Sequence, residues 1–388
     1  MKNLILISAL AVSFASKANK LSHSISASPT YLQVTNVLIV PPASSKIQVA
    51  LLLDTSNSMD GLIDQAKSRI WEIVNTLTTL KYQGTNPDIE IALYEYGNDG
   101  LSAEKGFIRQ VAPLTKDLDL ISEKLFALRT NGGSEYCGNV IHSSIDELQW
   151  DDGANTMKLI YISGNEPFNQ GPVDYKKAIN KALKNKVYVN TIFCGDKETG
   201  IKEFWQDGAV KGEGKYFNIN SNAKVEYIVT PYDTQINACN QKLNKTYIGY
   251  GRHGVSKKAN QVAQDENAQS ISSSNTAERV VSKSKAAYSN EEWDMVDSYR
   301  KDKGSIQKMS KEELPSEFKN KSKEEITKII EEKTAEREKI QKEIGELAVK
   351  RQKFITEESK KKSNKSDDLG VAIKSSILDL ASKNGFKQ

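Results

Sequence analysis

Histidine and cysteine are scarce in this 388-residue sequence, which has three of each. Nucleophilic catalysis by a cysteine needs a histidine in contact with it. Cys137 and His142 are close in sequence, but a spacing of five along one helix does not bring two side chains together. Asp54 and Glu166 are an alternative pair for acid–base hydrolysis, but the serines after Asp54 favour cation binding. We therefore do not expect an enzyme.

The sequence also lacks a large excess of basic over acidic residues. The chain has 54 Lys and Arg against 50 Asp and Glu, and its net charge of +4 is too small to predict binding to nucleic acid or a membrane. There is no Walker-type loop. The Gly-x-Gly-x-x-Gly match at 249–254 follows a predicted helix instead of a strand, so we interpret it as a flexible turn. Beyond the N-terminus, no run is long and apolar enough to span a bilayer.

Residues 1–18 have the pattern of a secretory signal peptide. Lys2 supplies a positive start, residues 4–14 are mostly apolar, and small residues follow. The apolar run is too short for a membrane span, and no cysteine near the cleavage site indicates a lipid anchor. The pattern predicts an exported protein, periplasmic or extracellular, in which 19–45 is an extended lead-in.

In an oxidising compartment, three cysteines allow one disulfide and one remaining thiol. Cys194 ends a predicted strand, and Cys137 lies in a loop at the same edge of the predicted sheet. Our first hypothesis is therefore a Cys137–Cys194 disulfide, with Cys239 left over. Three buried thiols are the alternative.

An apolar run at 49–53 stops at Asp54, and Ser56 and Ser58 follow at alternate positions. Apolar residues then recur with the spacing of one helix face: Met59, Leu62, Ile63, Ala66, Ile70, Ile73, Val74 and Leu77. The pattern predicts a buried strand, a short loop and a helix. Ligands of open α/β sheets bind at the carboxyl ends of strands, and hydroxyl and carboxylate oxygens suit Mg²⁺. The alternative is that a serine only caps the helix.

Strand and helix patterns alternate from here to about residue 250. We expect strands at 47–54, 89–96, 107–114, 157–163, 187–194 and 215–219. We expect the later helices at 118–128, up to 148, at 173–183, 201–205 and 223–243, the last broken at Pro231. This order predicts an α/β fold over 46–250, with a doubly wound, mainly parallel sheet and helices on both faces. The second and third strands are expected to be antiparallel.

After residue 250 the composition changes. Residues 251–320 are rich in Ser, Asn, Gln, Ala and Lys and have few large apolar groups, so we expect a partly disordered linker. Residues 321–388 are expected to form a charged helical tail. Its first helix starts at a capping box, Ser322 and Glu325, and runs to about residue 360.

Apolar residues of this tail roughly follow the heptad spacing of a coiled coil, but Lys333 and Arg337 interrupt it. A second, amphipathic helix is expected at 369–381. Three arrangements stay open: the tail docks on the main domain, pairs with a partner helix, or extends into solvent.

The Asp-x-Ser-x-Ser pattern of Asp54, Ser56 and Ser58, between a strand and a helix, resembles the metal-ion-dependent adhesion site of von Willebrand factor type A domains. The resemblance covers about residues 45–250 and implies a Rossmann-like type A domain in an exported bacterial protein. It also implies that the two serine hydroxyls ligate a cation directly, while Asp54 acts mainly through bound water.

In that family a second loop brings a threonine, usually after a pair of glycines. Here Gly132 and Gly133 precede Ser134, which takes the threonine's place and keeps the hydroxyl. Thr130 is the second choice, because it precedes the glycines instead of following them.

The third loop of the family normally carries an Asp, and that position falls on Gly164. The missing carboxylate lowers the negative charge of the site. Asn165 or Glu166 is then expected to supply an oxygen, directly or through water, and Glu135 of the second loop is a further choice. The alternative is a partly degenerate site that binds metal poorly.

The resemblance implies a divalent cation, Mg²⁺ or else Mn²⁺ or Ca²⁺, whose open coordination position takes an acidic side chain of a partner protein. We therefore expect an exported, metal-dependent binding protein with a protein or glycan partner. The alternative is a structural or assembly subunit that acts through its helical C-terminal tail and has a degenerate metal site. A third possibility, a subunit serving an ATPase, is disfavoured by the signal peptide.

Overall fold

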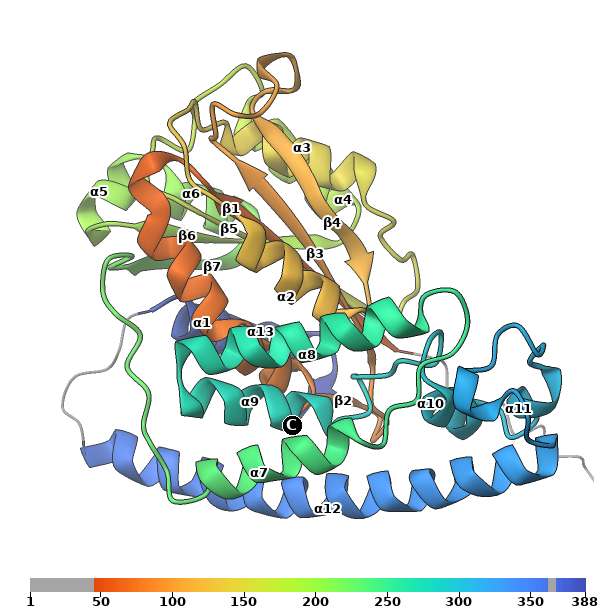
Figure 1. The fold of residues 1–388 in the computed structure, drawn as a ribbon. Helices are drawn as coiled ribbons and strands as arrows, with labels where there is room; N and C mark the ends of the chain where they lie inside the picture. Colours follow the sequence, from red (N-terminus) through yellow and green to blue (C-terminus); the bar gives the residue numbers. More distant parts are fainter. Residues whose placement is uncertain (1–44, 362–367) are drawn as a thin grey trace, which may run out of the picture. The chain divides into compact units, whose positions relative to one another are not determined.

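Six strands form one sheet in the part of the chain that this computed structural model describes, residues 45–361 and 368–388 (Figure 1). In their order across the sheet they are β4 (Ile108–Thr115), β3 (Asp88–Tyr96), β1 (Lys46–Asp54), β5 (Thr156–Gly164), β6 (Val187–Cys194) and β7 (Glu213–Ile219). All neighbours are parallel except β3 and β4. Counted along the chain, these strands have the order 3-2-1-4-5-6 of a Rossmann sheet. The predicted α/β fold and its antiparallel pair are confirmed.

The apolar run of β1 is buried on both sides of the sheet. Val49 and Leu51 belong to one cluster of buried side chains, and Ala50 and Leu52 belong to another. Successive residues of a strand point to opposite faces, so an apolar run without alternation needs helices over both faces. The run therefore accounts for the central position of β1 in a sheet that has helices on both faces.

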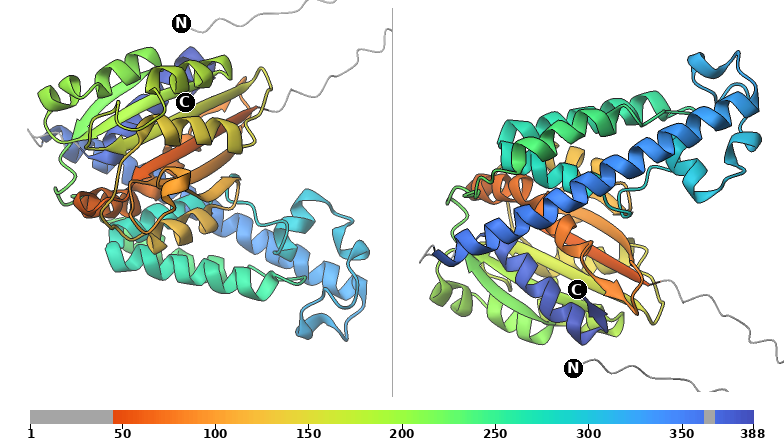
Figure 2. Two further views of the ribbon diagram at one scale, coloured as in Figure 1. Left: turned by 90° about the horizontal axis from the view of Figure 1, so that it is seen from above. Right: turned by 90° about the horizontal axis from the view of Figure 1, so that it is seen from below.

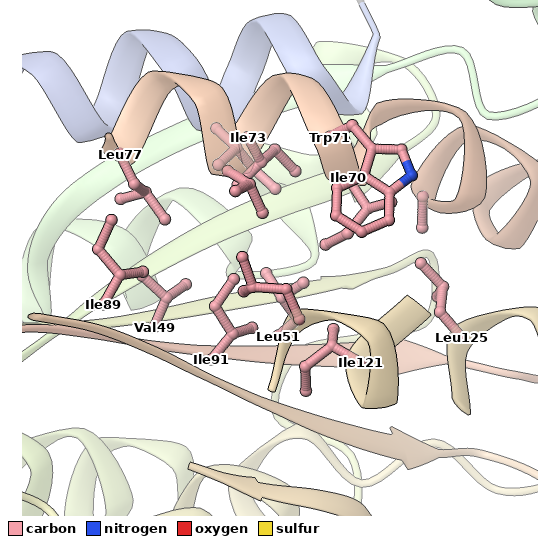
Figure 3. Packing of buried hydrophobic residues seen from close by; sticks show 14 of the residues in the cluster. Val49, Leu51, Ile70, Trp71, Ile73, Leu77, Ile89, Ile91, Ile121 and Leu125 are labelled. Atoms are coloured by element: carbon pink, nitrogen blue, oxygen red, sulfur yellow. The ribbon is translucent and has the colours of Figure 1, made fainter. Parts of the chain in front are cut away.

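Helices cover both faces of the sheet. On the face of Val49 and Leu51 lie α1 (Asp60–Leu77), α2 (Leu118–Ala127) and α13 (Leu369–Lys383). On the other face lie α3 (Cys137–Glu147), α4 (Tyr175–Lys184) and α6 (Trp205–Lys211), with the short α5 (Lys197–Lys202) before α6. Figure 3 shows the first layer, in which Ile70, Ile73 and Leu77 of α1 pack against the strands.

The remaining helices lie outside α1 and α2. They are α7 (Asp233–Asn244), α8 (Gly254–Ile271), α9 (Ser273–Lys283), α10 (Met295–Lys301), α11 (Ser305–Lys308) and α12 (Lys323–Lys361). Short 3-10 turns occur at η1 (Asn57–Met59), η2 (Ala103–Lys105) and η3 (Ser316–Phe318). α8 packs on α2, α9 packs on α1, and α12 runs along α7 (Figures 1 and 2). Near the C-terminus β8 (Phe386–Lys387) pairs with β2 (Lys81–Tyr82).

The prediction of a partly disordered linker over 251–320 is wrong. This segment holds α8 to α11, and side chains of α8 and α9 belong to the same core cluster as the sheet. Several of the side chains buried in this segment are charged and form ion pairs. Arg279 of α9 is fully buried, donates to Asp119 of α2 at 2.8 Å and to Asp265 of α8 at 2.5 Å, and lies over the Trp71 ring of α1. A search for apolar periodicity misses such a segment because its buried charges are compensated by partners far away in the sequence.

Of the three arrangements left open for the tail, the structure has the first, in which the tail docks on the main domain. Arg337, which interrupts the heptads, is fully buried; it donates to Asp294 at 2.6 Å and Asp297 at 2.8 Å, and lies 3.9 Å from the Tyr247 ring centre. Most of the heptad-spaced apolar residues of α12 thus face their own chain: Ile326, Ile330, Ile340, Ile344 and Leu347. Arg337 interrupts the heptad spacing because it forms buried ion pairs with Asp294 and Asp297. The structure shows no coiled coil among the described residues.

Most predicted boundaries agree with the structure to within a few residues. The capping box of α12 is confirmed, since the Ser322 N–H donates to Glu325 at 2.8 Å and the Glu325 N–H donates to Ser322 Oγ at 3.2 Å. The helix predicted over 223–243 is shorter and begins at Asp233, after Pro231.

The predicted signal peptide and all but the last residue of the lead-in lie outside the described residues. The described residues belong to one compact unit, which includes the helices beyond residue 250. None of the helices in the described ranges is both long enough and apolar enough to span a membrane.

Candidate metal centre

Asp54 is the last residue of β1, the strand at which the order of strands across the sheet reverses. After β1 the chain adds β3 and β4 on one side, and it returns to add β5, β6 and β7 on the other. The carboxyl ends of β1 and β5 therefore border the topological switch point, the usual ligand position in such sheets. Asp54 is fully buried, its Oδ1 accepts the Ser56 N–H at 2.8 Å, and its Oδ2 has no hydrogen-bond partner among the described residues.

Two serine hydroxyls and an amide oxygen gather beside Asp54. The chain leaves β1 and turns through η1, which places Ser56 Oγ 3.2 Å from Ser58 Oγ. Ser58 Oγ also donates to Asn165 Oδ1, at 3.3 Å, from the loop after β5. Neither serine caps the helix that follows. The structure thus brings together the first-loop hydroxyls and one of the predicted third-loop residues.

Glu135 is a second buried carboxyl at this site. It comes from the loop between α2 and α3, it is 4% exposed, and its Oε2 has no hydrogen-bond partner among the described residues. Its backbone N–H donates to Gln170 Oε1 at 3.1 Å. The candidate set from the sequence gave Glu135 only as a further choice, because nothing in the local sequence distinguishes a buried glutamate in a loop from an exposed one.

The two carboxyl groups influence each other's ionisation. Burial, and then the neighbouring Glu135, raise the pKa of Asp54 well above its usual range. Burial also raises the pKa of Glu135, and repulsion from Glu166 adds to this. Both effects disfavour two negative charges in one buried place, unless a cation lies beside them.

The third loop has no room for a carboxylate at the position that the family resemblance implies. A Cβ on Gly164 would lie 2.5 Å from Tyr96 Oη, 3.1 Å from Asp54 Oδ2 and 3.2 Å from the Trp205 ring. The Tyr96 hydroxyl is held in place because it donates to the Ser163 carbonyl at 3.0 Å. Glycine at 164 is therefore a packing requirement of this site.

The other predicted residues, Ser134 included, make no hydrogen bond to the Ser56–Ser58 hydroxyl pair among the described residues. Glu166 is half-buried, and its carbonyl accepts the Trp205 Nε1–H at 2.8 Å. Thr130, the second choice for the second loop, donates instead to Asp60 in the first turn of α1.

The donor set fits a hard cation. It consists of hydroxyl, amide and carboxylate oxygens, which Mg²⁺, Mn²⁺ and Ca²⁺ accept, and two of its buried carboxylate oxygens have no partner in the described chain. No cluster of three or more His, Cys, Asp or Glu side chains able to hold a metal occurs in residues 45–361 and 368–388. A cation here would therefore depend on the serine hydroxyls.

The cysteine predictions are corrected by the structure. All three cysteines are free thiols, so the proposed Cys137–Cys194 disulfide is wrong. The alternative of three buried thiols holds for Cys137 and Cys239, whereas Cys194 is only partly buried. Cys137 is buried next to Tyr96, with Sγ 3.8 Å from the hydroxyl oxygen, and burial raises the pKa of this thiol. His142 lies 3.3 Å from Asp146 and 3.2 Å from Lys181. No hydrogen bond between described residues links it to Cys137.

Comparison with known proteins identifies no family for this chain. No protein-family model and no curated protein match it. Among solved structures, an aerotolerance-related membrane protein from Bacteroides fragilis has 16% identity and a TM-score of 0.32, over 45% of this chain and 93% of its own. A von Willebrand factor type A protein from Catenulispora acidiphila has 16% identity and a TM-score of 0.34, over 46% and 39% of the two chains. Proximal thread matrix protein 1 from the mussel byssus, solved with zinc in its adhesion site, has 14% identity and a TM-score of 0.34, over 45% and 41%. Similarity at this level carries no functional conclusion.

Proposed function

We propose that this protein binds a divalent cation of the Mg²⁺ type at the end of β1 and uses it to hold an acidic group of a partner protein. One observation carries the proposal: Asp54 is fully buried at the switch point, beside the paired hydroxyls of Ser56 and Ser58, and no described residue donates a hydrogen bond to its Oδ2. A buried carboxylate without a counter-charge is costly. A cation held by hard oxygen ligands compensates it.

Each residue has a defined task in this proposal. Ser56 and Ser58 supply hydroxyl oxygens to the cation, and Asp54 supplies negative charge behind them, mainly through bound water. Asn165, already in contact with Ser58, supplies an amide oxygen from the third loop, while Glu166 and Ser134 lie in the loops that border the site. The cation provides a coordination position that a carboxylate of the partner can take.

The proposed role is binding without catalysis, outside the cytoplasm. The signal-peptide pattern of residues 1–18 supports export, and the hydroxyl-rich loop after Asp54, which suits cation binding better than acid–base chemistry, supports a binding role. The competing role, assembly through the helical tail, has less support because α12 buries its apolar residues against its own chain.

Calorimetric titration of the full chain without its predicted signal peptide, with MgCl₂ or MnCl₂, tests the cation. We expect one saturable site, no measurable binding in Asp54→Asn, and at least about a tenfold weaker site in Ser58→Ala. Asp152→Asn, which changes an exposed aspartate away from the site, is the matched control and should bind normally. Absence of binding in the unmodified chain, or equal binding in Asp54→Asn, would overturn the proposal.

Acetate serves as a probe of the acidic partner. Water bound to Mn²⁺ speeds the relaxation of solvent protons, so acetate entering the open position should lower the relaxation rate of the Mn²⁺-loaded protein. Formamide, which has no negative charge, is the control. If acetate has no effect beyond that of formamide, the cation site stands but the acidic partner does not.

A further inference from the structure

The site holds a carboxylate that the resemblance does not assign. We infer that Glu135 of the second loop provides the second negative charge of the cation site, in the role that an aspartate of the third loop would have at position 164. This inference rests on the proposed cation binding. It is carried by three independent features of the structure: the closed space at 164, the open space beside Gly97, and the lack of a basic partner for the two carboxyl groups within residues 45–361 and 368–388.

A third-loop carboxylate is excluded by what surrounds Gly164. The 2.5 Å separation between a Cβ at 164 and Tyr96 Oη is shorter than any real contact of a Cβ, and Asp54 Oδ2 and the Trp205 ring close the other sides. Tyr96 cannot easily withdraw, because it is completely buried and hydrogen-bonded to the Ser163 carbonyl. Charge for a cation must therefore come from another loop.

The space for Glu135 is created by Gly97, which follows β3. A Cβ on Gly97 would lie 2.7 Å from Glu135 Cγ and 2.8 Å from Asp54 Oδ1, so the two acids border the same point in space. Gly97 has a φ of 76°, which a residue with a Cβ rarely adopts. Without a glycine here, Glu135 could not lie against Asp54.

Backbone hydrogen bonds with the segments after β1 and after β3 hold the second loop in this position. The Asn131 N–H donates to the Thr55 carbonyl at 3.0 Å, and the Asp99 N–H donates to the Gly132 carbonyl. A Cβ on Gly133 would lie 2.5 Å from the Gly97 carbonyl, so the loop approaches the end of β3 as closely as only glycine permits. Glu135, two residues after Gly133, is buried in the protein.

The two acids have no basic side chain beside them in the described part of the chain. No ion pair among the described residues involves Asp54 or Glu135, and each has one carboxylate oxygen without a hydrogen-bond partner. Other buried acids of this protein, such as Asp265 and Asp294, have arginine partners. Two buried carboxyl groups without a basic partner among the described residues supply hard oxygen ligands of the kind that a divalent cation takes.

Titration of Mg²⁺ and Mn²⁺ into Glu135→Gln and Glu166→Gln separates the two possible sources of the second charge. Glutamine keeps the shape of glutamate. We expect Glu135→Gln to weaken cation binding by about 10- to 100-fold and Glu166→Gln to change it by less than about threefold. Unchanged binding in Glu135→Gln, or the larger loss in Glu166→Gln, would overturn the inference while the cation site itself stands. Absence of binding in the unmodified chain would instead mean that the proposed function fails.

Thermal unfolding gives a second readout, in which cation binding is measured as a gain in stability. The unfolding temperatures of the unmodified chain, Glu135→Gln and Glu166→Gln are first measured in EDTA as references. Addition of Mg²⁺ should raise the unfolding temperature of the unmodified chain and of Glu166→Gln, but far less that of Glu135→Gln. Equal responses of all three proteins to Mg²⁺ would contradict the assigned role.

Discussion

At the scale of single residues, two glycines determine the composition of the proposed cation site. Gly164 ends β5 next to the Tyr96 hydroxyl, and Gly97 leaves room for Glu135 beside Asp54. The two positions differ in what they require. Gly97 needs both a positive φ and an empty space, whereas Gly164 needs only the space.

Gly97→Ala is therefore expected to damage both stability and the site. A left-handed conformation costs a residue with a Cβ about 1–2 kcal/mol, and displacement of Glu135 or Asp54 adds to this. We expect a loss of more than about 2 kcal/mol in urea unfolding together with loss of Mg²⁺ binding. Gly84→Ala is the matched control, because Gly84 has a φ of 82° but no atom within 4 Å of its missing Cβ. It should cost only the conformational part and leave Mg²⁺ binding intact.

At the scale of elements, buried arginines join the outer helices to the core. Arg279 connects α9 to α1, α2 and α8, and Arg337 connects α12 to the segment around α10. Arg351 of α12 donates to Asp233 of α7 at 2.8 Å. Such pairs add little net stability compared with apolar packing, but the loss of one partner leaves the other charged and buried. These buried arginine–aspartate pairs determine which helices pack against each other.

Arg337→Ala should therefore be severely destabilising. It removes the cationic partner of Asp294, which is fully buried, and breaking such a pair costs about 3–5 kcal/mol. Lys333→Ala, one turn earlier on α12, is the control, because Lys333 pairs only with Glu336 on the exposed side. It should cost less than about 1 kcal/mol. Similar effects of both changes on urea unfolding would show that Arg337 is not a docking residue.

Glu278 of α9 makes the same helix contacts sensitive to pH. Burial, and then repulsion from Glu72, raise the pKa of Glu278 to about 7, although Arg351 lies 3.5 Å away. In the unfolded chain the group titrates near 4.5. The folded state thus holds an extra proton between these values, so this contribution is present below about pH 4.5 and is lost as the pH rises through 7.

The free energy of unfolding should accordingly fall between pH 5 and 7.5, by up to about 3 kcal/mol from this group alone. Glu278→Gln should remove that part of the pH dependence and leave the rest. Urea unfolding of both proteins at several pH values in this range measures the difference. Parallel curves for the two proteins would rule out Glu278 as the titrating group.

At the scale of the whole molecule, the last helix completes the layer that covers the sheet. α13 packs on α1 and on β6 and β7, although more than 140 residues separate it from β7. The start of α13 is fixed by Asp368, which accepts two hydrogen bonds from Arg69 of α1. Its buried residues belong to the same cluster as β1: Leu369, Ala372, Ile373, Ile377, Leu380 and Ala381. A fragment of residues 46–250 therefore lacks part of its own core.

A chain that ends at residue 361 is expected not to fold cooperatively. The four large apolar side chains of α13 contribute about 1.5–3 kcal/mol each, which together rivals the whole stability of a typical domain. Loss of the near-UV circular dichroism signal and binding of a hydrophobic dye would report this. Ile377→Ala, at 0% exposure, should cost about 2–5 kcal/mol. Val371→Ala, at 40% exposure on the same helix, should cost far less. A stable, cooperative truncated chain would contradict the assignment of α13 to the core.

The sequence by itself determined those features whose pattern is local. The apolar run before Asp54, the spacing of Ser56 and Ser58 and the helical period that follows predicted β1, the site loop and α1. The alternation of strands and helices predicted the sheet. These signals are readable because burial of a strand or a helix face requires apolar residues at a fixed spacing.

Tertiary structure alone decided which distant groups meet. The sequence contains Glu135, Arg279 and Arg337, but it does not show that each is buried against a group 40 to 160 residues away. Composition therefore suggested a linker where α8 and α9 pack, and it left open whether α12 docks on its own chain. Buried charges leave no periodic pattern, because their compensation depends on the position of the partner in space and not on the neighbouring sequence.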